Sequence, residues 1–163
     1  MHDALTIYFN GEKNAGLFIA VIGAAVIVAA LVLFRARADF RPFALTLGIV
    51  ALVEIAIGVG LYLRTDPQVG RLRAQLDSSP SSFYTDEGAR MARVQRNFVA
   101  IEYVEVALII VTAIVAIARK SNATLTGVAL GLLINAALLL AFDLIAERRG
   151  AVYLAAIETR GTA

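Results

Sequence analysis

The stretch FVAIEYVEVALIIVTAIVAIA, residues Phe98–Ala118, decides the fold class of this chain. It is apolar over the roughly 20 residues that an α-helix needs to cross the hydrocarbon core of a bilayer. It also contains Glu102 and Glu105, at a depth where a charged side chain costs at least about 2.5–3.5 kcal/mol. Three more runs are apolar over a similar length: Ala15–Phe34, Phe43–Leu63 and Leu125–Ala146. Four crossings predict an all-α membrane protein, folded as one antiparallel bundle of four transmembrane helices.

Composition supports this assignment. Apolar residues make up 60% of the 163 residues, against about 45–50% in an average soluble domain. The four spans leave only an N-terminal tail (1–14), a loop (64–97) and a C-terminal tail (147–163) outside the bilayer, so we expect a single membrane domain. The net charge of +2 comes from loop arginines interspersed with acidic residues, a pattern that favours lipid headgroups over nucleic acid as the partner. The absence of cysteine excludes disulfides and thiolate chemistry.

The tails and the loop contain signals for further helices. The N-terminal tail is amphipathic and is expected to lie in the membrane interface, with Tyr8 and Phe9 at headgroup depth. In the loop 64–97, Pro67 predicts the end of the second helix, and the apolar spacing predicts a short interfacial helix over Gln68–Leu76. The serine-rich run 77–82 is expected to interrupt the helical structure.

The third helix is predicted to be unusually long. Nothing except Gly88 interrupts a helical pattern from Asp86 to Lys120, which spans about 50 Å at 1.5 Å per residue. A hydrocarbon core is about 30 Å thick, so the loop-proximal end of this helix should project beyond the bilayer. The fourth helix is expected to be interrupted at Gly150.

Four acidic residues within the spans form the candidate site: Glu54, Glu102, Glu105 and Asp143. Topology places all four in the half of the bilayer that faces the tails and the loop. On helix three, Glu102, Glu105 and Thr112 share one face. In one interpretation these acids are structural. They are then either paired with loop-side cations, for which the candidates are Arg64, Arg93, Arg96, Arg148 and Lys13, or protonated and bonded to Tyr62, Tyr103 or Asn135. In the other they bind or relay a proton or cation.

No pattern of catalytic or cofactor-binding residues is found. The chain has one histidine, His2, in the N-terminal tail, whereas di-iron bundles use Glu-x-x-His on two helices. Hard cations accept oxygen ligands alone, but a lone acidic pair on one helix is a common pattern. We therefore expect no enzyme activity, no metal and no cofactor.

Small residues predict close helix packing. Gly127-x-x-x-Gly131, followed by Asn135, gives the fourth helix a small face, and Gly16 begins a similar stripe on the first. Packing inside the bundle is the first interpretation of both stripes, and association of two copies of the chain is the second.

Two segments carry a resemblance. Tyr8–Lys13 (YFNGEK) before the first span, and Arg90–Phe98 (RMARVQRNF) leading into the acidic helix, resemble small four-helix integral membrane proteins of bacteria that are uncharacterised as a group. The resemblance covers nearly the whole chain and implies no activity.

These observations predict a non-catalytic accessory or interaction protein in the membrane, with a small proton- or cation-transporting protein as the alternative. The resemblance places it in the inner membrane of a bacterium. Basic residues near the membrane number ten on the side of the tails and loop and five on the other side. By the positive-inside rule, both termini are expected in the cytoplasm.

Overall fold

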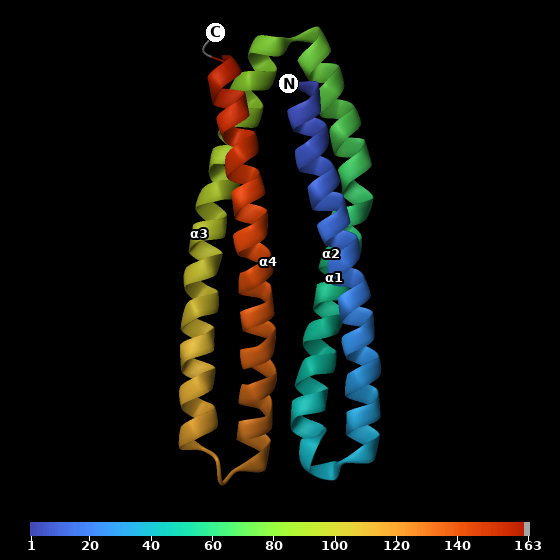
Figure 1. Ribbon diagram of the computed structural model, residues 1–163, viewed down its shortest axis with the longest axis vertical. Helices are drawn as coiled ribbons and strands as arrows, with labels where there is room; N and C mark the ends of the chain where they lie inside the picture. Colours follow the sequence, from blue (N-terminus) through green and yellow to red (C-terminus); the bar gives the residue numbers. More distant parts are fainter. Residues whose placement is uncertain (162–163) are drawn as a thin grey trace.

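The structure is a computed structural model that describes residues 1–161, and it consists of four long helices (Figure 1). In chain order the elements are α1 (His2–Ala36), a 3₁₀ turn η1 (Ala38–Phe40), α2 (Arg41–Ser78), α3 (Pro80–Ala118) and α4 (Ala123–Gly161). The described residues contain no strand. Each of the four helices is long and apolar enough to cross a membrane, so the predicted all-α four-helix bundle is confirmed.

The bundle is built from two helical hairpins. Helix α1 packs along α2, α3 packs along α4, and the hairpins meet mainly through α2 and α4. The two ends of the chain and the α2–α3 turn lie at one end of the molecule, which we call the loop side (Figure 1). The links within the two hairpins lie at the opposite end, the hairpin side.

The helices are much longer than a bilayer is thick. Helices α3 and α4 have 39 residues each, or about 58 Å at 1.5 Å per residue, against a hydrocarbon core of about 30 Å. The predicted extension of the third helix is therefore confirmed. The other three helices extend on the loop side as well, which was not predicted.

The expected loop 64–97 is almost entirely helical, and this corrects the predicted boundaries. Helix α2 continues through Pro67 to Ser78, and α3 begins at Pro80, so that Ser79 is the only residue between them outside a helix. Pro67 is exposed, where the carbonyl group that it leaves without a helical partner can bond to water. Pro80 fits at the start of α3 because the first N–H groups of a helix need no intrahelical acceptor.

Two smaller boundaries were also wrong. Helix α3 ends at Ala118 rather than at Lys120. Helix α4 passes through Gly150 without a break, because this glycine lies where α4 approaches α3. A Cβ added at Gly150 would collide with the amide of Gln95, whose nitrogen donates to the Glu147 carbonyl at 3.2 Å.

The loop-side ends of the helices form a compact apolar core, which we call the head. All nine residues of this core lie outside the predicted spans: Leu5, Tyr8, Phe9, Leu72, Leu76, Phe83, Met91, Tyr153 and Ile157. The N-terminal tail therefore does not lie flat in the interface as predicted. Its apolar residues have helical spacing and continue the buried face of α1 into the head.

Buried positions recur every seven residues along each helix. Helix α2 buries Ala51, Gly58 and Thr65 in this register, and α4 buries Ala136, Gly150 and Ile157. A seven-residue period is shorter than two turns of a straight α-helix, so it favours a left-handed supercoil. We call this row of positions the seam. Within the predicted spans most of its residues on α1, α2 and α4 are glycine or alanine, and in the head most are large.

Glycines in the seam and beside it bring helices into close approach. A Cβ on Gly58 would lie 2.5 Å from the Gly16 carbonyl oxygen, and one on Gly131 would lie 2.9 Å from the Thr46 side chain. The predicted small faces of α1 and α4 thus pack inside the bundle. Asn135 contributes no bond between helices, because its amide donates to the carbonyl of Gly131 on its own helix at 2.8 Å.

Candidate site of intramembrane carboxylates

The seam determines where the acids of the predicted site lie. Glu105 is seven residues before Thr112, and both side chains are buried on α3. Asp143 occupies the corresponding position on α4, seven residues after Ala136 and seven before Gly150, and it is half-buried. Since α3 and α4 pack side by side, the shared register brings the two acids to the same interface. Glu102, which is partly buried, lies one turn before Glu105, so the predicted common face of Glu102, Glu105 and Thr112 agrees with the structure.

Three of the four acids lie together and the fourth lies apart. Asp143 and Glu102 are the two charged groups that act on Glu105, and Asp143 in turn interacts with Glu102 and with Glu12 of α1. We call Glu102, Glu105 and Asp143 the carboxylate cluster. Glu54 is buried on α2 with 8% of its surface exposed, and no charged side chain acts on it in the described part of the chain.

None of the predicted ion-pair partners reaches these acids. Within residues 1–161, Arg64, Arg93 and Arg96 form no ion pair with any carboxylate, and all three are exposed. The predicted neutral partners do not serve either. Tyr103 is 73% exposed, and Asn135 bonds within its own helix.

The cluster therefore contains carboxyl oxygens without hydrogen-bond partners. Oε2 of Glu105 and Oε1 of Glu102 are shielded from solvent and bond to nothing in the described structure, and the Glu105 side chain is only 7% exposed. A buried polar group left in this state costs about 1–3 kcal/mol. Chemically, such an oxygen can take up a proton or accept a hydrogen bond from a cationic group.

Other loop-side charges form ion pairs between helices, close to the predicted loop-side membrane boundary. Lys13 bonds to Asp66 at 2.5 Å, joining α1 to α2, and Arg149 bonds to Glu12 at 2.9 Å, joining α4 to α1. The hydrogen bond that Lys13 donates to the Asp66 carboxylate raises the pKa of the Lys13 ammonium. These pairs join residues far apart in the sequence, so no local pattern could have indicated them.

The head contains a buried ion pair that was not predicted either. Arg90 donates to both carboxylate oxygens of Glu87, at 2.6 and 2.7 Å. Burial disfavours the charged form of Arg90, but Glu87 outweighs this and raises the pKa of the guanidinium. The three-residue spacing of an acid and a base on one helix was the available signal.

Two tyrosines complete this part of the head. The rings of Tyr8 and Tyr153 stack with centroids 4.6 Å apart. Burial raises the pKa of both phenols, and the negative charge of Glu12 beside Tyr8 and of Glu87 beside Tyr153 raises them further. Both hydroxyls are therefore neutral at physiological pH.

Within residues 1–161, no hydrogen bond links the carboxylate cluster to a polar side chain farther toward the hairpin side. The next buried polar residues on α3 and α4 are Thr112 and Asn135. Thr112 donates to Leu108 of its own helix at 2.7 Å, and Asn135 likewise bonds within α4. Nor does the described part of the chain contain a group of three or more acidic or histidine side chains that could hold a metal ion.

No protein-family model matches this sequence, and neither a curated protein nor a solved structure proves similar to it.

Proposed function

We propose that this chain is a non-catalytic accessory or interaction protein of the membrane, which associates with a partner through its intramembrane carboxylates. The observation that carries the proposal is the lack of a cation beside Glu102, Glu105 and Asp143 in residues 1–161. A partner helix with one arginine or lysine at the same depth would supply the missing charge. Opposite charges attract more strongly at low dielectric than in water, so one such residue would provide both affinity and register.

The packing of the hairpin side supports an interaction role over transport. The seam there consists mostly of glycine and alanine, and its two buried polar side chains bond within their own helices. A transported proton would need groups that continue through this half of the bundle.

The second candidate is a small proton- or cation-transporting protein. One specific observation favours it, which is that Glu105 is buried, unpartnered and close to two further carboxyl groups. Acids in such surroundings occur in proton relays. This candidate requires a second conformation in which the hairpin side opens.

The association is tested with synthetic transmembrane helices in liposomes. The probe is a leucine–alanine helix with one arginine placed at the depth of Glu105, and its control has leucine at that position. We expect energy transfer between labelled protein and the arginine probe, little transfer with the control, and loss of the difference in a Glu102→Gln/Glu105→Gln/Asp143→Asn variant. Equal transfer for both probes with the parent protein would contradict the proposal.

Ion flux in the same liposomes separates the two candidates. The interaction proposal predicts no proton or cation flux above that of empty liposomes. Flux in the parent that disappears in a stably folded Glu105→Gln variant would establish the second candidate instead. Glu54→Gln is the matched control, because it removes a buried carboxylate that lies outside the cluster.

We further propose that the chain resides in the inner membrane of a bacterium, with both termini in the cytoplasm. The support is the count of basic residues, which is ten on the loop side against five on the hairpin side. The head would then lie in the cytoplasm.

A further inference from the structure

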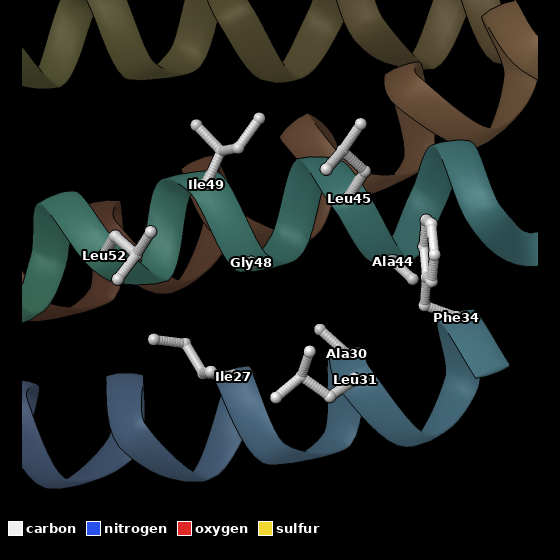
Figure 2. A pocket seen from close by; sticks show the side chains of 9 residues that line it. All are labelled: Ile27, Ala30, Leu31, Phe34, Ala44, Leu45, Gly48, Ile49 and Leu52. Carbon is white, nitrogen blue, oxygen red and sulfur yellow. The ribbon is translucent and has the colours of Figure 1, made fainter.

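An apolar groove runs between α1 and α2 in the hairpin-side half of the predicted spans. Figure 2 shows the nine side chains that line it, and all nine are apolar. Small residues of the two helices form its floor, where Ala30 of α1 faces Gly48 of α2. Large residues form its walls, and four of these are more than half exposed: Leu31, Leu45, Ile49 and Leu52. The groove has a volume of about 280 Å³.

The groove is oriented along the helices, from the hairpin-side boundary toward the middle of the bilayer. Phe34, the last residue of the first predicted span, lies at its outer end, and Ile27 lies seven residues deeper on the same helix. Seven residues correspond to about 10 Å of helix, compared with about 15 Å for half of a hydrocarbon core. The groove therefore has the position and direction of a lipid acyl chain in one leaflet.

Three arginines lie beyond the outer end of the groove, in and around η1. Arg35, Arg37 and Arg41 are exposed, and none of them pairs with an acid in the described structure. Arg41 belongs directly to the groove end, because its guanidinium lies over the Phe34 ring at 5.4 Å and its Nε donates to the Phe34 carbonyl at 3.4 Å. Asp39 is the one acid in this segment, so the net charge is positive.

This arrangement matches one kind of molecule. We propose that the groove binds an anionic phospholipid of the hairpin-side leaflet, with one acyl chain between α1 and α2 and the phosphate beside Arg37 and Arg41. The apolar walls suit an acyl chain and disfavour a charged occupant, and the unpaired arginines favour a headgroup with net negative charge. The inference depends on membrane insertion and is independent of the proposed partner.

Because the chain contains no tryptophan, a single introduced tryptophan reports on the groove. We would place it by Phe34→Trp, and by Ile117→Trp as a control at an exposed site near the same membrane boundary on α3. Quenching by brominated phosphatidylglycerol is compared with quenching by brominated phosphatidylcholine in mixed bilayers. The expected result is a preference for phosphatidylglycerol at position 34 that exceeds the preference at position 117.

Arginine substitutions test the headgroup contacts. A basic residue near an anionic surface is worth about 1 kcal/mol, which corresponds to about a fivefold change. Arg37→Gln and Arg41→Gln should each lower the preference at position 34 by about that factor. Arg119→Gln, at the hairpin-side link between α3 and α4, should leave it unchanged.

Groove filling tests the acyl chain. Gly48→Leu places a side chain in the groove, and its Cβ would have ordinary contact with Ala30 at 3.8 Å. Gly60→Leu is the matched control on the same helix, with nothing within 4 Å of its Cβ. We expect the first variant, and not the second, to reduce quenching by both lipids.

Native mass spectrometry of the unmodified protein provides a measurement that needs no tryptophan. Phosphatidylglycerol retained by the parent and by Arg119→Gln, but lost from Arg41→Gln, is the expected result. Equal retention of phosphatidylglycerol and phosphatidylcholine by the parent would overturn the proposal. So would equal quenching by the two lipids at positions 34 and 117.

Discussion

The substitution Glu87→Gln tests whether the buried ion pair holds the head together. Glu87 is 2% exposed and Arg90 is 33% exposed, so the pair is buried on one side and reached by water on the other. Breaking a fully buried pair costs about 3–5 kcal/mol. Glutamine keeps one acceptor for Arg90, and the guanidinium is partly hydrated, so one hydrogen bond to a charged group is lost, worth about 1.5–3 kcal/mol. We expect a loss of about 2 kcal/mol in the free energy of unfolding.

The measurement is reversible unfolding in mixed detergent micelles, followed by circular dichroism. Asp86→Asn is the matched control, because the neighbouring Asp86 is exposed and accepts one bond from Gln75 at 3.0 Å. Its loss should stay within about 0.5 kcal/mol. Glu87→Leu with Arg90→Met should recover most of the stability, since apolar replacement of a buried pair is often neutral or stabilising. Equal stability of Glu87→Gln and the parent, or an equal loss in Asp86→Asn, would refute the reasoning.

Three further predictions concern packing, pH and orientation. Gly58→Ala should destabilise the bundle by about 1–3 kcal/mol, because its Cβ would meet the Gly16 backbone, whereas Gly60→Ala should cost nothing; equal thermal stability of the two variants would contradict the close α1–α2 contact. The neutral forms of Tyr8 and Tyr153 contribute stability that is fully present below pH about 10. This contribution should be lost as the pH rises above that value, because the pKa of each phenol is higher in the folded than in the unfolded chain. Tyr153→Phe should shift this alkaline unfolding to higher pH in a circular dichroism titration. A reporter enzyme fused to the C-terminus that is active only after export should be inactive, and activity would reverse the proposed orientation.

The fold class and the four long apolar helices could be predicted from the sequence because hydrophobic runs of about 20 residues are typical of membrane helices. The extension of α3 was predictable for a related reason, since its helical pattern continued beyond the apolar run. The continuity of α2 through Pro67 was not, because proline favours a helix end in general and the neighbouring packing decides the outcome. In α2 that packing is provided by Leu72 and Leu76, which are buried in the head.

The site could be predicted only in part. Helical periodicity placed Glu102 and Glu105 on one face, and topology placed Asp143 at a similar depth. The separation of Glu54 from the cluster depends on how α2 is rotated against α3 and α4, which one helix's sequence does not determine. The pairs Lys13–Asp66 and Arg149–Glu12 also depend on tertiary contacts across 53 and 137 residues.

The head has a consequence for the biosynthesis of this chain. Its core combines Leu5 from the first turns of α1 with Ile157 from the last turns of α4, so it remains incomplete until α4 has been synthesised and has packed into the bundle. Without α4, Tyr8 would lack the stacked ring of Tyr153, and the apolar side chains at the start of α1 would lose part of their cover. The burial of these side chains therefore depends on the correct placement of α4.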